Sequence, residues 1–210
     1  MSDLIQQSLF SAAPSAERLT PATPRDRAID WAIRMVANPD VVYLDLETTG
    51  IGSDAEICDV GIVAADGSVL VDTLVRPENP IPAEAEAVHH ISDLMVKDAP
   101  TFPEVIDTIR SAVGGKVLLV YNLGYDLPLI NRVCQRYDLP PISLDIAGRG
   151  CAMLAYSDLI GELNEWGKPR WHKLDKAAER YGIPPGGHRA LADAITARLV
   201  VIGMSKELAS

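Results

Sequence analysis

The side chains best suited to chemistry fall in three short segments of the chain. Asp45 and Glu47 lie in the first, Asp126 in the second, and His188 and Asp193 in the third. Carboxylate oxygens and imidazole nitrogens are the usual protein ligands of divalent metal ions, and imidazole also exchanges protons near neutral pH. The sequence therefore predicts a metal site with a proton acceptor, provided that the fold brings the three segments together.

The first pair follows the apolar run 41–44, which predicts a buried β-strand. Residues two apart on a strand point to the same face, so Asp45 and Glu47 would present two carboxylates together. Buried carboxylates are costly unless they are paired or bind a metal. Acidic residues at a strand end can also serve solubility alone, so this pair is not sufficient evidence.

The second segment, Tyr121 to Asp126, follows another predicted buried strand at 116–121. Asp126 would then lie at the start of a helix over 124–137. Acidic residues are also common at helix starts because they favour the positive end of the helix dipole. The position alone therefore leaves a purely structural role open.

The third segment places His188 after the Gly/Pro loop 182–187 and Asp193 at the start of a predicted helix over 189–207. Five helical positions correspond to a rotation of about 500°, so the two side chains would not share a helix face. They converge only if His188 belongs to the loop. A surface histidine and an exposed helical charge are the simpler alternatives.

The rest of the pattern predicts an α/β fold, a mixed sheet of about five strands with three antiparallel strands followed by parallel ones, flanked by helices. Asp66-Gly67 predicts a hairpin turn. The first 24 residues are expected to form a flexible tail and linker, and 25–210 a single domain. The remaining expected strands are 56–64, 68–75 and 142–145, and the remaining expected helices are 24–37, 103–113, 147–162 and 172–181.

The composition limits the possible partners. The net charge of −10 argues against a protein that coats nucleic acid, unless bound cations supply the positive charge. Nearly half of the residues are apolar, yet no apolar run is long enough to span a membrane, and the first residues do not resemble a secretory signal. Three widely spaced cysteines suit a reducing compartment, so a cytoplasmic location is expected.

Taken together, the motifs D-L-E-T-T-G, N-L-G-Y-D and G-H-R-A-L-A-D-A resemble the DEDD exonuclease superfamily. The histidine in the last motif is similar to the subtype of the proofreading epsilon subunits of bacterial DNA polymerase III, and the resemblance covers about 40–203. It implies a ribonuclease H-like fold and 3′–5′ removal of nucleoside monophosphates. It also implies two Mg²⁺ or Mn²⁺ ions about 4 Å apart, one to activate a water and one to stabilise the leaving oxygen. The implied ligands are Asp45, Glu47, Asp126 and Asp193, with His188 as general base.

The segment from Val88 to Ser92 resembles the H-G-I-T region of this superfamily, which lies beside the terminal nucleotide. His90 stands where the family has glycine, and Tyr121 stands where it often has histidine. The residues that the resemblance places at the terminal nucleotide are Thr48, Thr49, His89 and Ile91.

Other side chains near the last motif are candidates for nucleic-acid contacts. Basic residues there could bind phosphates and two tryptophans could stack on bases, although surface charge and ordinary packing are equally good explanations. Asp145 is expected to have a structural role, capping a following helix. The basic candidates are Lys168, Arg170, Lys173 and Arg189, and the aromatic ones are Trp166 and Trp171.

Near the N-terminus, Gln6, Ser8, Leu9 and Phe10 belong to a segment that resembles the bacterial sliding-clamp-binding peptide. A tethered peptide would keep the enzyme close to its DNA by raising the effective concentration. The alternative is a segment whose Leu and Phe pack on the domain. The peptide favours single-stranded DNA 3′ ends over RNA, and a clamp or a DNA polymerase as partner in replication or repair.

Three rival functions remain open at this point. An aspartyl-phosphate phosphatase would use the first motif but leaves H-R-A-L-A-D unexplained. A DEDD-like domain without activity could bind nucleic acid or a polymerase, although none of the four carboxylates is missing. An RNA-trimming exoribonuclease would use the same site.

Overall fold

The computed structural model describes residues 23–208. Gln6, Ser8, Leu9 and Phe10 lie outside the described residues, so the clamp peptide and the division into tail and domain stay predictions. Within the described part of the chain, no helix is both long and apolar enough to cross a membrane.

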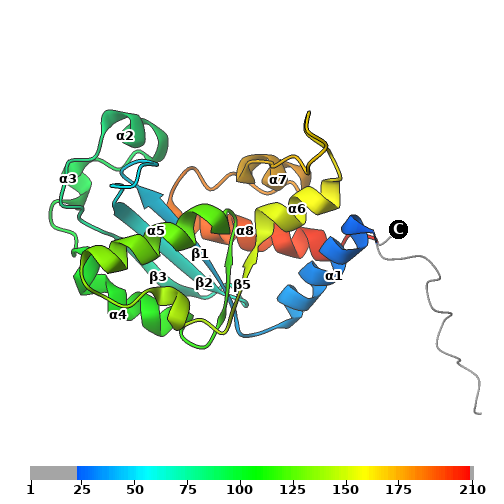
Figure 1. Cartoon of the computed structure of the whole chain (residues 1–210), viewed down its shortest axis with the longest axis horizontal. Helices are drawn as coiled ribbons and strands as arrows, with labels where there is room; N and C mark the ends of the chain where they lie inside the picture. The colour runs from blue at the N-terminus through cyan, green and yellow to red at the C-terminus, as the bar shows by residue number, and fades with distance from the viewer. Residues whose placement is uncertain (1–22, 209–210) are drawn as a thin grey trace, which may run out of the picture.

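The centre of the molecule is a five-stranded mixed sheet (Figure 1). Its strand order is β3-β2-β1-β4-β5, with β1 antiparallel to β2, β2 antiparallel to β3, and β4 parallel to both β1 and β5. This confirms the predicted sheet of three antiparallel strands followed by parallel ones. The strands are β1 (Val41–Thr48), β2 (Ile57–Ala64), β3 (Val69–Leu74), β4 (Val117–Val120) and β5 (Gly148–Cys151).

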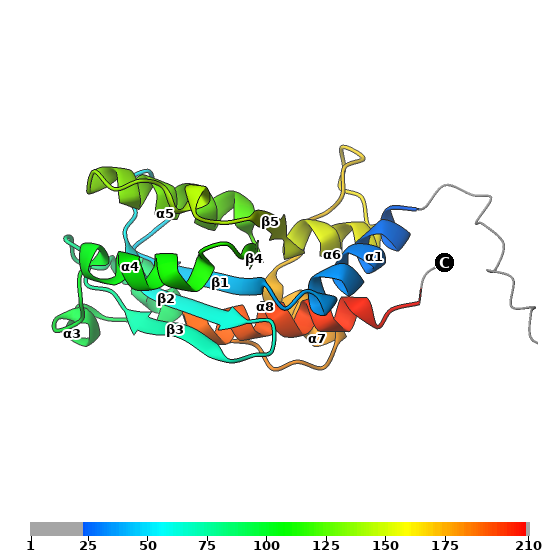
Figure 2. The ribbon, with the colours of Figure 1, turned by 90° about the horizontal axis from the view of Figure 1, so that it is seen from below.

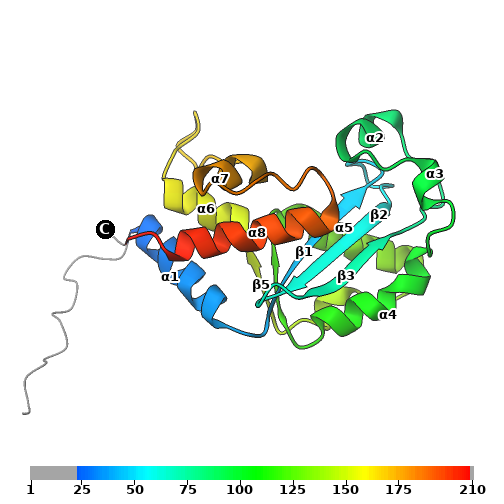
Figure 3. The ribbon, with the colours of Figure 1, turned by 180° about the vertical axis from the view of Figure 1, so that it is seen from behind.

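Helices cover both faces of the sheet. In Figure 2, α4 and α5 lie on one side, and α1 and α8 on the other. Figure 3 shows α8 running across β1 and β2, with which it packs, and α7 beside it. The helices are α1 (Pro24–Ala37), α2 (Ala83–His89), α3 (Asp93–Val96), α4 (Phe102–Val113), α5 (Leu123–Arg136), α6 (Ala152–Ile160), α7 (Leu174–Arg180) and α8 (Ala190–Ser205), with a 3₁₀ turn η1 at Ile142–Leu144.

The alternation of side chains along β1 assigns its two acidic residues to one face. Val42 and Leu44 belong to the core under α4 and α5, whereas Val41 and Tyr43 belong to the core under α1 and α8. Successive strand residues point to opposite faces, so Asp45 and Glu47 continue the face of Val41 and Tyr43. Both carboxylates therefore lie on the α8 side of the sheet.

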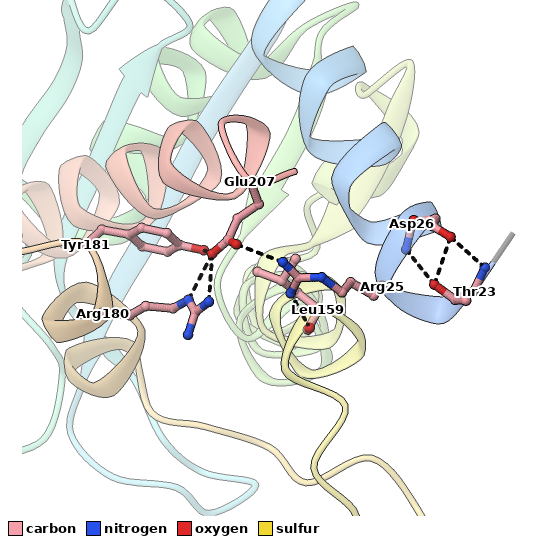
Figure 4. A network of polar contacts seen from close by, with 7 residues as sticks. All are labelled: Thr23, Arg25, Asp26, Leu159, Arg180, Tyr181 and Glu207. Atoms are coloured by element: carbon pink, nitrogen blue, oxygen red, sulfur yellow. Dashed lines mark hydrogen bonds and ion pairs between the residues drawn. The ribbon is translucent and has the colours of Figure 1, made fainter. Parts of the chain in front are cut away.

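The turn and the first helix form as their sequences predict. The Asp66 carboxylate accepts a hydrogen bond from the Ser68 backbone N–H at 2.9 Å, which closes the turn between β2 and β3. Thr23 and Asp26 form a capping box at the start of α1, shown at the right of Figure 4. The chain thus enters the domain through a helix that packs under α6 and α8.

The prediction of a strand over 142–145 was wrong. Residues 142–144 form η1, and the edge strand β5 occupies 148–151, inside the expected helix 147–162. Pro140 and Pro141 lack the N–H groups that a ladder needs, and the Leu144 N–H bonds back to Pro141. The sequence pattern did not predict β5 because it contains Gly148 and Gly150, and glycine is uncommon in strand interiors.

Asp145 does not cap a helix, since none follows it directly. Its carboxylate pairs with Arg110 of α4, and its carbonyl accepts from the Gly115 backbone N–H at 2.8 Å. The expected structural role therefore holds in another form: Asp145 ties the loop before β5 to α4.

Candidate active site

The first three carboxylates meet at the edge where β1 and β4 end. These strands run parallel, with Leu44 opposite Val120, so their carboxyl ends lie side by side. Two residues separate β4 from α5, which begins at Leu123. Asp126 lies in the first turn of α5 and is 5% exposed. Open sheets of parallel strands commonly bind ligands at this edge. Asp45, Glu47 and Asp126 all line one cleft there.

The last helix reaches the same edge because β2 provides a seat for its N-terminus. Asp59, opposite Glu47 in the register, is 1% exposed and accepts from Arg189 Nε at 2.8 Å and the Ala190 N–H at 3.2 Å. A Cβ on Gly61 would lie 2.2 Å from the Leu191 backbone nitrogen, so only glycine permits this approach. The start of α8 is thereby held directly over β1 and β2.

This seat brings His188 and Asp193 together across the turn that precedes α8. His188 lies in the loop, in a left-handed conformation (φ 56°), and its Nδ1 is 4.0 Å from Asp193 Oδ2. A Cβ on Gly186 would lie 1.8 Å from Asp193 Oδ1, so the loop passes against that carboxylate. His188 therefore lies in the loop and not in the helix, which is the condition under which the two side chains can converge. The His188 side chain is 51% exposed, which leaves it accessible to solvent and substrate.

All five predicted catalytic residues line a cleft of about 430 Å³. Ligand atoms of Glu47, His188 and Asp193 lie within 4.8 Å of one another, close enough to share a cation. Asp45 and Asp126 add further oxygen donors in the same cleft. Carboxylate oxygens suit Mg²⁺ and Mn²⁺, so this donor set fits a divalent metal site.

The carboxyl groups of the cleft are held away from water and close to each other. Burial raises the pKa of Asp45 well above its usual value, and the charges of Asp126 and Asp193 raise it further. Burial, followed by the Asp193 charge, raises the pKa of Glu47 to about 8. Burial also raises the pKa of Asp126 to about 7 and that of Asp193 to about 6, His188 opposing the latter. A bound cation would relieve this repulsion.

The predicted nucleotide contacts are placed differently from the catalytic residues. His89 is 2% exposed and Ile91 is fully buried, and His89 Nδ1 accepts from the Ile91 backbone N–H at 3.0 Å. Neither side chain lines the cleft, and their contact with a nucleotide stays a prediction. His90 adopts a left-handed conformation (φ 59°), which glycine adopts more easily.

Thr48 and Thr49 hold the turn after β1 in shape. Thr48 Oγ1 donates to the Gly50 carbonyl at 2.8 Å and lies 3.1 Å from the Tyr125 hydroxyl. Thr49 Oγ1 accepts from the Glu56 backbone N–H at 2.9 Å. Both threonines are partly exposed beside the cleft, so their contact with a nucleotide stays a prediction.

Sequence reasoning missed two features that shape the site. One is Asp59, whose signal was an acidic residue within an otherwise apolar strand. The other is Tyr121, whose hydroxyl donates to the carbonyls of His172 and Lys173 at 3.0 and 3.2 Å. These bonds hold the segment before α7, which forms one wall of the cleft. That wall includes Trp171 and Asp175. The departure from the family histidine at Tyr121 was the available signal.

The mixed sheet with acidic residues at its edge is a ribonuclease H-like fold. A family model described as "Exonuclease" (RNase_T) matches residues 42–200. The chain belongs to this exonuclease family, as the motifs predicted. Exonucleases of this family act on nucleic acids and use divalent metals.

Individual relatives agree with this assignment. The chain is 37% identical over 180 residues to an uncharacterized exonuclease, CP81, of Escherichia phage 186, covering 83% of this chain and 90% of that one. It is 24% identical to the DNA polymerase III subunit epsilon of Treponema pallidum, covering 79% and 76%. The nuclease domain of 3′hExo, a DEDDh family member, matches in fold with a TM-score of 0.62 at 19% identity, covering 78% of this chain and 90% of that domain.

Proposed function

We propose that this protein is a 3′–5′ exonuclease that uses two divalent cations to remove mononucleotides from single-stranded DNA ends in replication proofreading or repair. One observation carries the proposal: three segments far apart in the sequence bring four carboxylates and a histidine into one cleft. Its volume, about 430 Å³, lies within the range of about 300–1,000 Å³ typical of small-ligand sites. A cleft of this size suits one terminal nucleotide.

The four carboxylates, Asp45, Glu47, Asp126 and Asp193, would bind the cations. Mg²⁺ or Mn²⁺ bound there would polarise the scissile phosphate and neutralise charge that develops on its oxygens. The raised pKa values of Glu47, Asp126 and Asp193 support this role, because a cation in the cleft would stabilise their charged forms.

His188 would act as the general base. Its half-exposed imidazole can take a proton from a water, while Asp193, 4.0 Å away, stabilises the imidazolium that results. The water oxygen forms a bond to phosphorus and the bond to the 3′ oxygen of the preceding nucleotide breaks. That oxygen leaves with the shortened strand, and a nucleoside 5′-monophosphate is released.

The preference for DNA rests on a relative, the subunit epsilon of DNA polymerase III. The 3′hExo nuclease domain was solved bound to rAMP, so RNA is the alternative substrate that the experiment must include. An association with a polymerase or a clamp belongs to the same proposal.

The test uses single-stranded DNA and the matching RNA, each labelled at the 5′ or the 3′ end, with Mg²⁺, Mn²⁺ or EDTA. We expect a metal-dependent ladder from the 5′ label and immediate mononucleotide release from the 3′ label, with DNA the faster substrate. Asp45→Ala should abolish both.

Each outcome decides one part of the proposal. Release of the 5′ label first would reverse the polarity, and faster RNA cleavage would make the enzyme an exoribonuclease. A wild-type protein inert with both metals on both strands would overturn the enzymatic proposal in favour of a binding module.

A further inference from the structure

A β-hairpin between α6 and α7 projects beyond both helices, as Figures 1 and 2 show. Leu163 and Pro169 form an antiparallel bridge across it. At the tip, the Asn164 side chain accepts from the backbone N–H groups of Trp166 and Lys168, both at 3.0 Å. We define this segment, residues 161–173, as the α6–α7 hairpin. These hydrogen bonds give its tip a definite shape.

The hairpin exposes two large aromatic rings. Trp166 at its tip is 73% exposed and Trp171 on its returning arm is 67% exposed. Tryptophan is usually well buried, and rings that stay exposed near a binding cleft commonly contact ligands. Neither ring can be explained by the core, since both lie outside its clusters.

Trp171 connects the hairpin to the active-site cleft. With His172 and Lys173 it lines that cleft, and the same three residues line a second hollow of about 390 Å³. Arg170 and Lys176 also line this second hollow. The two hollows thus share the wall that Trp171, His172 and Lys173 form.

Tyr121 fixes the position of this wall relative to the catalytic residues. Its hydroxyl hydrogen bonds to the His172 and Lys173 carbonyls hold the returning arm, and Tyr121 directly follows β4, five residues before Asp126. These two hydrogen bonds therefore fix the returning arm of the hairpin relative to the cleft carboxylates.

The hairpin carries three basic residues and two acidic ones, Glu162 and Glu165, so it is slightly positive although the whole chain carries −10. Lys168, Arg170 and Lys173 are exposed, and within residues 23–208 neither lysine has an ion-pair partner within 4.0 Å. Arg170 lies 3.8 Å from Glu162 in an exposed pair, which contributes little. Acidic Glu165 and Asp175 are interspersed, so the pattern suits a few phosphates and not a continuous duplex backbone.

We propose that the α6–α7 hairpin binds the single-stranded nucleic acid next to the terminal nucleotide, with Trp171 and Trp166 stacking on successive bases and Lys168 and Arg170 contacting phosphates. Exposed bases are required for stacking, and only a single strand offers them. The inference rests on the proposed exonuclease function and adds a subsite to it.

The test measures kcat/KM for oligothymidylates of two and eight nucleotides with Trp166→Ala and, separately, Lys168→Ala. A dinucleotide has only one base beyond the terminal nucleotide, so it cannot stack on both tryptophans. We expect the ratio of eight-nucleotide to two-nucleotide kcat/KM to fall about tenfold in Trp166→Ala, equivalent to about 1.4 kcal/mol. In Lys168→Ala the ratio should fall severalfold, and the loss should shrink with added salt. Lys206→Ala, an exposed lysine beyond the far end of α8, should leave the ratio at the wild-type value.

A parallel titration of 5′-labelled octathymidylate, followed by fluorescence anisotropy in a His188→Ala background, measures binding without rapid cleavage. We expect Trp166→Ala to weaken this binding by the same factor. A wild-type enzyme that cleaves both substrates, with an unchanged ratio in both hairpin variants, would overturn the subsite while leaving the exonuclease intact. A protein whose binding depends on the hairpin but that cleaves nothing would overturn the exonuclease and keep the subsite.

Discussion

Asp193 near the start of α8 and Glu207 just beyond its end are acidic side chains with opposite electrostatic surroundings. Beyond its C-terminus, Glu207 accepts hydrogen bonds from Arg25 at 2.8 Å and Arg180 at 2.9 Å, with the Tyr181 hydroxyl at 3.3 Å (Figure 4). At its N-terminus, Asp193 faces the other cleft carboxylates. Burial alone would raise the pKa of Glu207, but the two guanidinium groups lower it below its usual value.

Burial does not explain the contrast, because the side chains of Asp193 and Glu207 are similarly buried, 10% and 17% exposed. The difference lies in the supply of counter-charge. Arg189, whose charge opposes the burial that raises the pKa of Glu47, pairs with Asp59 and so holds the helix in place. The cleft carboxylates repel each other, and we expect a bound divalent cation to relieve this repulsion.

The largest expected effect breaks the acidic end. Asp45→Asn should lower kcat/KM at least about 1,000-fold, roughly 4 kcal/mol, through the loss of a cation ligand. The same change should raise the free energy of unfolding in EDTA at pH 8, because an amide removes one repelling charge. Activity assays and urea denaturation check the two effects. Asp107→Asn, an exposed residue of α4, is the matched control, and a destabilised Asp45→Asn would contradict the electrostatic account.

The pH dependence of the free energy of unfolding should distinguish the contribution of the cleft carboxylates from that of Glu207 without any mutation. Carboxyl groups with raised pKa values bind more protons in the folded state, so the free energy of unfolding falls as pH rises from about 4 to about 8. We expect a loss of about 2 to 3 kcal/mol between pH 5 and 8 without metal, after allowance for partial solvent screening. His89 opposes this weakly, because burial lowers its pKa.

Metal should reverse this slope. Chemical denaturation across this pH range, in EDTA and in saturating Mg²⁺, measures the free energy of unfolding without and with metal. The stabilisation by Mg²⁺ should grow with pH. A metal-free protein whose stability is flat or rises over the whole range would refute the storage of repulsion in the cleft.

The seat of α8 positions the acidic end of the helix without binding a cation, so Arg189→Ala is expected to have an intermediate effect. It leaves Asp59 buried without its guanidinium, which should cost about 2 kcal/mol, less than a fully buried pair because Arg189 is partly exposed. It should also lower kcat by displacing His188 and Asp193. Arg198→Ala removes a bond from Nε to the Ala65 carbonyl farther along α8 and serves as control. It should lose stability but keep kcat, whereas equal kcat losses in both variants would argue against a specific role of the seat.

The sequence was informative where the relevant pattern is local. Asp45 and Glu47 are two apart on one strand, and the turn at Asp66 needs only its neighbours, so strand and hairpin could be predicted directly. Helix geometry also showed that His188 and Asp193 could converge only with His188 in the loop, although the sequence left a surface histidine open as the alternative.

The missed features depend on partners far apart in the chain. Asp59 and Arg189 are 130 residues apart, and nothing in either segment identifies the other. The strand at Gly148 is stabilised by its ladder to β4 and not by its own weak strand preference, so tertiary contacts override the local pattern. His89 and Ile91 matched a family motif, yet the motif does not specify whether they face the cleft or the core.

The smallest effect concerns the paired end. Glu207→Gln should lower the free energy of unfolding at pH 7 by about 1 to 2 kcal/mol, because two charge-assisted hydrogen bonds become neutral ones. A lowered pKa means that this contribution is present above the usual glutamate range and is lost as pH falls through the folded value, so the variant and the wild type should converge below about pH 4. Denaturation at several pH values measures this, and kcat/KM should stay at the wild-type value, since Glu207 lies beyond the far end of α8. A loss of activity equal to that in Asp45→Asn would mean that the two ends are coupled through the helix, and the division between a stabilising end and a catalytic end would then fail.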